Sequence, residues 1–334
     1  MILKKFILLF SIIAIAFMFV SCGNNSSSFE LPTRILVSDD IYNFGNYEYM
    51  VYDDETIVIV AYNGSESKLI IPETIDGKKV VEIGAHAFAT NESIKSVRLS
   101  QHIEIIGSYA FYGCSFLSDI YISNNVWSIG ESAFDWTPWY NAQTDDYIVV
   151  GDGVLLKYQG TERHVTIPDN VRHLSSAFGM NNDIVCVEMG DSVLTVGRYA
   201  FAYCEYLKHV KLGNNIVLID GYAFENCLSL TSVDIPDKVQ KIGEYAFNYC
   251  NYITNVRIGK SVKEIGANAF KTCLRVRSFS IPAALEKVGD SAFSECYSIT
   301  LVFYGGTEYD FDSLELDGSN YLLKDAIKIY CAKD

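Results

Sequence analysis

The sequence is poor in basic residues, and this shortage excludes one large class of partners. The 334 residues include 26 lysines and arginines against 41 aspartates and glutamates, which gives a formal net charge of −15. A protein that binds nucleic acid needs a basic patch to meet the phosphate backbone. The composition therefore predicts no nucleic-acid partner and favours a soluble surface whose like charges repel one another.

Residue patterns that carry catalysis are also missing. None of the five histidines stands in HExxH spacing, and no GxSxG, P-loop or GxGxxG context occurs. No CxxC pair is present, which argues against a metal cluster. The sequence therefore predicts no catalytic residue, no cofactor, no metal and no enzyme. A constellation assembled from distant segments is the enzymatic alternative. The histidines are His86, His102, His164, His173 and His209.

Cysteine is not scarce, but its placement does not suggest disulfide pairs. Six of the nine cysteines lie four residues after an alanine that recurs along the chain. A residue type repeated at one position of successive units forms a column, so we expect these thiols to be small, buried and reduced, even in an oxidising compartment. The six are Cys114, Cys204, Cys227, Cys250, Cys273 and Cys296.

One hydrophobic run stands out, between Phe6 and Val20, and it follows two lysines. It is short for a membrane span, which needs about 20 apolar residues. A basic start, an apolar run and a small residue are typical of a secretory signal peptide. The ending Phe19-Val20-Ser21-Cys22 resembles a bacterial lipobox, with Phe where Leu is usual. It predicts a signal peptide over residues 1–21 and a lipid on Cys22. An ordinary cleaved signal and a retained anchor are the alternatives.

The most informative feature is a repeat of 23 residues. The dipeptide Ala-Phe begins at Ala200, Ala223, Ala246, Ala269 and Ala292, each time 23 residues further on. A fixed period of about 20 to 50 residues indicates a stack of repeated units. Such a stack grows by adding coils to one continuous core, so the length of the chain does not require two domains.

Within each repeat, aliphatic residues recur at fixed distances from the alanine. The seventh residue after it is aliphatic, and the tenth and twelfth alternate with polar residues, as in Val233 and Ile235. Alternation with a period of two indicates a strand with one buried face. The sixteenth and nineteenth residues supply a second inward pair, and glycine usually follows, which we expect to let the chain turn sharply. The pattern predicts a solenoid of about ten coils.

The chain departs from the repeat in three places. Residues 22–45 follow the signal as a lipidated N-terminus and tether, and residues 46–86 contain a hairpin and a first, irregular repeat. The solenoid is expected over 87–304, with one modified coil at 135–168 that contains a hairpin around Gly151-Asp152-Gly153. Residues 305–334 are expected to form a C-terminal cap, whose last strand covers the open end.

The repeated pattern resembles the BspA-like leucine-rich repeats of bacterial surface lipoproteins. The match runs from Leu230 to Pro236, through Val239, Ile242 and Gly243, to Ala246-Phe247 and Cys250, and extends over roughly 62–304. The resemblance implies a leucine-rich-repeat solenoid of the α/β type, rich in strands, with short helical or 3-10 turns. It also implies non-enzymatic recognition, often adhesion to host or neighbouring-cell proteins, but it does not identify a ligand.

The outward residues of the repeated strands are the first candidate site. Residues at one position of successive coils line up about 4.8 Å apart and form a lengthwise ribbon. The mixture of charged residues and tyrosine suits an adaptable protein-binding surface, in which Tyr and Arg are common anchors. A solvated sheet face without a ligand is the alternative. The predicted contact residues are Arg98, Tyr121, Glu188, Lys211, Asp234 and Arg257.

Aromatic residues give a second candidate site. Trp136, Trp139 and Tyr140 lie in the modified coil and are the best cluster for a glycan, although a packed bulge explains them as well. Tyrosines that precede the repeated alanine, such as Tyr199 and Tyr222, also suit either glycan stacking or packing between coils.

Three functions remain open at this point. The first is a lipid-anchored protein of the bacterial envelope, in the outer membrane and exposed at the cell surface, that binds a host extracellular or neighbouring-cell protein. The second is a glycan-binding accessory lipoprotein, and the third is a structural envelope protein. We expect a monomer attached to the membrane by its N-terminal lipid.

Overall fold

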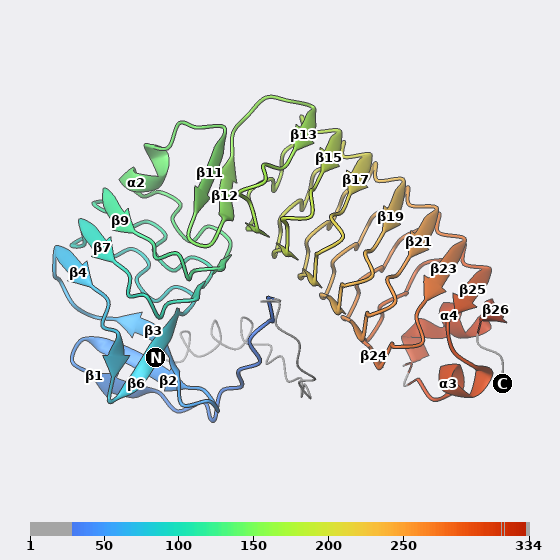
Figure 1. Ribbon diagram of the computed structural model, residues 1–334, viewed down its shortest axis with the longest axis horizontal. Coiled ribbons are helices and arrows are strands. Elements are labelled where there is room, and N and C mark those ends of the chain that lie inside the picture. Colours follow the sequence, from blue (N-terminus) through green and yellow to red (C-terminus); the bar gives the residue numbers. More distant parts are fainter. Residues whose placement is uncertain (1–28, 315, 317, 332–334) are drawn as a thin grey trace. The chain divides into compact units, whose positions relative to one another are not determined.

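The computed structural model describes residues 29–314, 316 and 318–331. Cys22 and the predicted signal peptide lie outside these residues. The chain is a β-solenoid of about 12 turns with few helices, so the predicted fold is confirmed. It divides into two compact units, residues 1–143 and 144–334, and the division falls inside the predicted modified coil (Figure 1). Within the described residues, no helix has the length and apolar character needed to cross a bilayer.

The first unit begins with antiparallel strands and continues as stacked coils. The predicted N-terminal hairpin is confirmed by β2 (Tyr47–Val51) and β3 (Ile57–Tyr62), and β1 (Tyr42–Phe44) pairs with β2. A second hairpin joins β5 (Thr74–Ile75) to β6 (Lys78–Ile83). Beyond these, parallel strands of successive coils form two columns. One column holds β4 (Lys68–Ile70), β7 (Ser96–Arg98) and β9 (Asp119–Tyr121); the other continues from β3 and β6 to β8 (Ile105–Ile106) and β10 (Ser128–Ile129).

The second unit starts with the hairpin predicted around Gly151-Asp152-Gly153, which β11 (Tyr147–Val150) and β12 (Val154–Tyr158) confirm. Its outer column of parallel strands contains β13 (His164–Thr166), β15 (Cys186–Glu188), β17 (His209–Lys211), β19 (Ser232–Asp234), β21 (Asn255–Arg257), β23 (Ser278–Ile281), β25 (Leu301–Tyr304) and β26 (Ile327–Tyr330). The second column follows β12 with β14 (His173–Leu174), β16 (Thr195–Val196), β18 (Leu218–Ile219), β20 (Lys241–Ile242), β22 (Glu264–Ile265) and β24 (Lys287–Val288).

Helices lie outside the regular repeats. The insert of the first unit contains α2 (Pro138–Asn141), with Thr137 as its N-cap. The C-terminal region contains α3 (Glu308–Asp312), η1 (Gly318–Asn320) and α4 (Tyr321–Asp325). After them, β26 pairs with β25, as the predicted closing strand requires.

The third side of each coil is a series of tight turns with 3-10-type hydrogen bonds, as the expected short 3-10 turns require. Successive backbone N–H groups there donate alternately to the next coil and to their own coil. The N–H of Phe201 donates to the carbonyl of Ala223 in the next coil, whereas that of Ala202 donates to Tyr199, three residues back in its own coil. The same alternation recurs in neighbouring coils, so the turns satisfy their backbone groups without a helix.

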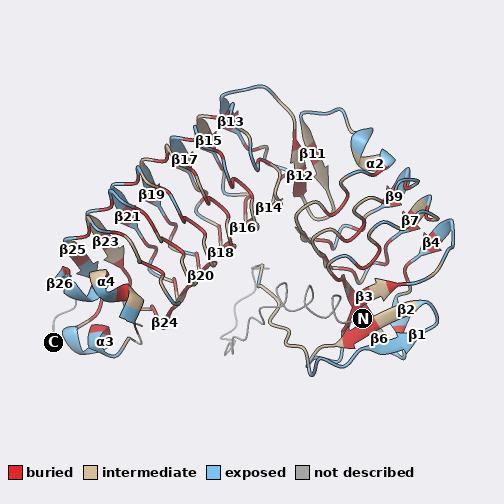
Figure 2. Ribbon diagram, turned by 180° about the vertical axis from the view of Figure 1, so that it is seen from behind, coloured by how far each residue is buried: buried red, intermediate tan, exposed pale blue. Residues whose placement is uncertain are grey.

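The core is shared by all coils of a unit. The predicted aliphatic positions are buried, as are the repeated phenylalanines, and Figure 2 shows burial along the inward-facing parts of the coils. The phenylalanine rings form columns with centroids 4.9–5.6 Å apart and nearly parallel planes. Stacked rings at this spacing add about 0.5–1.5 kcal/mol per pair beyond the area they bury. One coil therefore stabilises the next.

The cysteine column lies beside the phenylalanine column. Each of the six Sγ atoms donates to the carbonyl of the phenylalanine in the preceding coil, at 3.0–3.2 Å. The eight cysteines among the described residues form no disulfide. Burial raises the pKa of the Cys114 thiol to about 11 and that of Cys204 to about 12. These thiols are buried, protonated donors.

The glycines that follow the second inward pair have a different role from the one we expected. Gly243 is typical, and its φ is not in the left-handed region. A Cβ at this position would lie 2.3 Å from the backbone nitrogen of Gly221 in the preceding coil. Glycine is needed there because the two backbones approach closely, and not because the chain turns sharply.

Candidate functional site

The outer strand column presents two rows of side chains, because the middle residue of each three-residue strand faces inward and is buried, or half-buried in the case of Val210 on β17. In β19, Val233 is buried while Ser232 and Asp234 point to solvent. The same pattern holds in β9 and β21, where both outer residues are exposed. The six predicted contact residues end up in three separate sheets.

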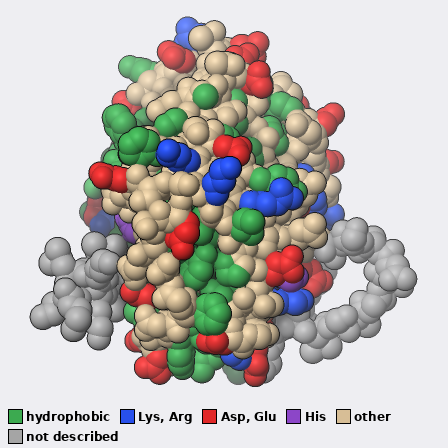
Figure 3. Space-filling view, turned by 90° about the vertical axis from the view of Figure 1, so that its left-hand side faces the viewer, with side chains coloured by type: hydrophobic (Ala, Val, Ile, Leu, Met, Phe, Trp, Pro, Cys, Tyr) green, Lys and Arg blue, Asp and Glu red, His purple; other side chains and the backbone are tan. Residues whose placement is uncertain are grey.

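The first unit brings two of them together. Arg98 and Tyr121 are register partners on β7 and β9, and the guanidinium carbon of Arg98 lies 4.6 Å from the centre of the Tyr121 ring. Ile70 on β4 continues the row and is 71% exposed. An apolar, a cationic and an aromatic side chain therefore lie side by side on a rigid sheet. Figure 3 shows that hydrophobic side chains gather on this side of the molecule, bordered by charges of both signs.

In the second unit the predicted contact residues form ion pairs with one another. Lys211 on β17 forms an ion pair with Glu188 on β15. Arg257 on β21 donates to Asp234 at 2.8 Å and to Asp237 at 2.6 Å. The backbone N–H of Lys260 and the Arg257 guanidinium lower the pKa of Asp237. These pairs are exposed, so each stabilises the fold only slightly. They also leave fewer free charges for a ligand than the sequence suggests.

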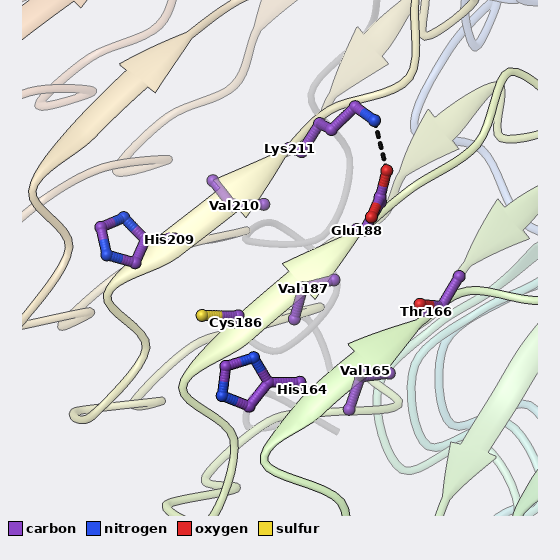
Figure 4. Close-up of a pocket in the computed structure, with 9 residues that line it drawn as sticks. All are labelled: His164, Val165, Thr166, Cys186, Val187, Glu188, His209, Val210 and Lys211. Atoms are coloured by element: carbon purple, nitrogen blue, oxygen red, sulfur yellow. Dashed lines mark hydrogen bonds and ion pairs between the residues drawn. The ribbon is translucent and has the colours of Figure 1, made fainter.

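A shallow depression of about 260 Å³ lies over β13, β15 and β17 (Figure 4). The middle residues of the strands form its floor: Val165 and Val187 are buried and Val210 is half-buried. One outward row consists of His164, Cys186 and His209, which are register partners. The other row consists of a threonine and the Glu188–Lys211 pair. Within the described residues, no group of three or more His, Cys, Asp or Glu side chains has an arrangement that could hold a metal ion.

The aromatic insert separates its three predicted contact residues. Trp136 is 70% exposed, whereas the Trp139 ring packs edge-on against Phe134, with centroids 5.1 Å apart. Tyr140 is half-buried, and burial together with the Asp135 carboxylate raises its pKa to about 12. Trp139 therefore contributes to the packing of the first unit, and Trp136 is the member of the cluster that is free to meet a ligand.

The tyrosines before the repeated alanine pack between coils. Tyr199, Tyr222 and Tyr245 form a stack with ring centroids 4.8 Å apart at each step. The guanidinium of Arg198 lies 4.6 Å from the Tyr222 ring and bonds to Glu244. Of the two interpretations considered for these residues, packing is the one that the contacts support.

The sequence interpretation missed Ile70. It stands between Leu69 and Ile71 in an apolar run, and such a run does not show which residue faces outward. Its register partner Arg98 lies 28 residues later, and not 23, because the first repeat carries the extra β5–β6 hairpin. Counting back from Arg98 in the next coil, with the extra hairpin residues left out, would have placed Ile70 on the exposed row.

Comparison with known proteins gives a family match and several related structures. The family profile described as BspA type leucine rich repeat region matches the chain in 6 copies, over residues 61–145 and 174–300. No curated protein matches.

Three bacterial proteins are among the solved structures that are similar to this chain. A leucine-rich repeat protein from Bacteroides ovatus is 25% identical, with a TM-score of 0.42, and the match covers 79% of this chain and 71% of that one. A leucine rich cell surface protein from Faecalibacterium prausnitzii is 19% identical, with a TM-score of 0.40 and coverage of 84% and 99%. The pneumococcal vaccine antigen PcpA is 16% identical, with a TM-score of 0.44 and coverage of 87% and 98%.

Proposed function

Because this chain belongs to the BspA-type leucine-rich-repeat family, we propose that it is a non-enzymatic protein of the bacterial cell envelope that binds another protein through its outer strand column. The partner is a host extracellular protein or a protein of a neighbouring cell. The observation that carries the proposal is the exposed row of Ile70, Arg98 and Tyr121 in the first unit.

The composition of this row supports protein binding. Arginine and tyrosine are enriched among residues that dominate binding energy at protein interfaces, and an exposed isoleucine gives apolar area to bury. Arg98 is stacked on Tyr121, so both side chains are partly ordered before a partner arrives. Less conformational entropy is therefore lost on binding. The ion-paired rows of the second unit have less to offer, because a partner would have to replace existing pairs.

We expect replacement of Arg98 and Tyr121 together by alanine to weaken binding to the protein ligand by about 2 kcal/mol or more, which is roughly thirtyfold in Kd. The measurement is surface plasmon resonance of the purified protein against immobilised extracellular-matrix proteins such as collagen and laminin. A Lys211→Ala/Arg257→Ala variant serves as the matched control, and we expect a smaller loss from it.

The proposal fails if the Arg98→Ala/Tyr121→Ala variant keeps wild-type affinity for every protein that the wild type binds. Binding to no protein, together with binding to polysaccharides that depends on Trp136, would favour the glycan-binding alternative. Trp136 keeps that alternative open because its ring is exposed, but Trp139 and Tyr140 give it less support because they are partly packed.

We further propose that the protein is held at the outer membrane by a lipid on Cys22 and is exposed at the cell surface. The lysines, the apolar run and the lipobox-like ending before Cys22 support this proposal. Palmitate supplied to bacteria expressing the protein is expected to label it, and Cys22→Ala is expected to abolish the label. Cys331→Ala, which removes the exposed cysteine of the described region, should leave labelling unchanged. Equal labelling of the wild type and the Cys22→Ala variant would contradict the anchor.

A further inference from the structure

One backbone position in each coil has a conformation that is costly for most residues. It is the third residue after the repeated alanine, and its φ lies between 56° and 68° in nine coils. Glycine and asparagine tolerate this left-handed region, and they occupy the position in two coils, at Gly113 and Asn226. Bulky side chains at positive φ are rare. The others at this position are Thr90, Trp136, Met180, Tyr203, Tyr249, Thr272 and Glu295.

Two tyrosines at this position are partly exposed. Tyr203 and Tyr249 are 40% and 42% exposed. The tyrosines before the alanine also have positive φ, but they stack on one another, as Tyr199 does on Tyr222. The left-handed φ is shared by all nine coils and therefore belongs to the fold, whereas Tyr203 and Tyr249 stand out because their rings reach solvent.

Three more exposed tyrosines lie on the same side of the coils. Tyr206, Tyr252 and Tyr297 are 57%, 49% and 66% exposed and stand five or six residues after the repeated alanine. We call Tyr203, Tyr206, Tyr249, Tyr252 and Tyr297 the tyrosine ridge. All five lie in the second unit, at the corner between the turn segments and the outer strands.

The ridge repeats every second coil. Tyr203 and Tyr249 are 46 residues apart, as are Tyr206 and Tyr252, and the coil between them carries Asn226 and Ser229 at the same two positions. Two coils correspond to about 10 Å along the stack. This is close to the length of one disaccharide in an extended polysaccharide, so a periodic ligand of that kind would meet equivalent tyrosines at successive disaccharides.

Positively charged side chains lie along the ridge, whereas the whole chain carries a net negative charge. Lys208, Arg275 and Arg277 are exposed and form no salt bridge within the described residues, and the Arg275 guanidinium lies 4.0 Å from the Tyr252 ring centre. The acids in the same parts of these coils are Glu205 and Glu295, and Glu295 pairs with Lys271. Cations without a salt bridge therefore accompany the tyrosines, although the protein carries a net charge of −15.

We propose that the tyrosine ridge binds an extended polysaccharide that carries carboxylate or sulfate groups. Tyrosine rings pack against the C–H faces of sugar rings and offer hydroxyl groups to sugar hydroxyls, and the three cations meet the acidic groups. The site is separate from the row of Ile70, Arg98 and Tyr121 that carries the proposed protein binding, and it uses neither Trp136 nor the insert.

The test replaces the two strained tyrosines by the residue found in the coil between them. In the Tyr203→Asn/Tyr249→Asn variant, we expect the affinity for hyaluronan and chondroitin sulfate oligosaccharides to fall at least about tenfold. We expect the melting temperature to stay the same or rise, because asparagine tolerates the left-handed conformation better than tyrosine. Isothermal titration calorimetry gives the affinity, and circular dichroism gives the melting temperature.

Two controls separate this proposal from the proposed protein binding. Tyr121→Ala removes an equally exposed tyrosine from the first unit and should leave polysaccharide binding unchanged. A neutral cello-oligosaccharide of matched length should bind more weakly than the acidic oligosaccharides. Unchanged polysaccharide affinity in the asparagine variant would overturn the proposal. So would a lower melting temperature, which would assign these tyrosines to packing, or a loss confined to a protein ligand.

Discussion

Replacement of Phe247 by alanine is expected to lower the free energy of unfolding by about 3–5 kcal/mol. The Phe247 ring is fully buried and lies between the rings of Phe224 and Phe270, each 5.2 Å away. Alanine would leave a cavity in the column, and the neighbouring coils cannot close it because their backbones are already hydrogen-bonded to one another. The substitution also removes two ring contacts at once.

The measurement is urea unfolding followed by circular dichroism. Phe116→Ala is the matched control, because Phe116 is 53% exposed and its removal should change stability by less than about 0.5 kcal/mol. If both substitutions cost the same, the phenylalanine columns do not hold the coils together in the way described.

Replacement of Glu82 by glutamine is expected to stabilise the protein by about 2–3 kcal/mol at pH 8 and to have little effect at pH 4. Burial raises the pKa of Glu82 from its ordinary 4.5 to about 7, although the Tyr52 hydroxyl donates to the carboxylate at 2.7 Å and Arg34 lies nearby. The Glu104 carboxylate raises this pKa further.

The sign of the effect follows from proton binding. Between about pH 4.5 and pH 7 the unfolded chain releases the Glu82 proton while the folded protein retains it. The free energy of unfolding therefore falls as the pH rises through this window. Above it, the cost of the buried charge is constant. Glutamine keeps an acceptor for the Tyr52 hydroxyl but has no charge.

Urea unfolding of the wild type and the variant across this pH range provides the check. Glu92→Gln is the matched control, because Glu92 is exposed and lies in the same unit. We expect the control to follow the wild type at every pH. If the free energies of unfolding of the Glu82→Gln variant and the wild type differ by a constant amount from pH 4 to pH 8, the folded protein does not hold the carboxyl in its protonated form.

Much of the fold could be predicted because the spacing of apolar residues in the repeat shows which side chains face the core. A period of 23 residues and a period of two within the strand were enough to place Val233 inside and Asp234 outside. The turn segments could not be predicted in the same way. Local propensity favours glycine or asparagine at positive φ, so tyrosine at Tyr199 or Tyr203 gives no sign of the conformation it adopts.

The candidate site was predicted less completely than the fold. Alternation identified the outward residues, but it does not show which of them neutralise one another. The information was present, because Glu188 and Lys211 are 23 residues apart, as are Asp234 and Arg257, so each pair faces across adjacent coils. The stacking of Arg98 on Tyr121 has the same spacing. A comparison of the residues 23 positions apart would have shown that the charges of the second unit pair with one another. It would therefore have favoured the first unit as the candidate binding site.

The cysteine column allows local opening of the coils to be measured with thiols that the protein already contains. Each of six coils carries one buried thiol at an equivalent depth, and each thiol is bonded to the coil before it. An alkylating reagent reacts with the thiolate, which forms only after a coil detaches and its thiol reaches water. The labelling rate at each cysteine therefore measures how often its own coil separates from the stack. Fraying at the ends can thus be followed coil by coil without adding a probe to the chain.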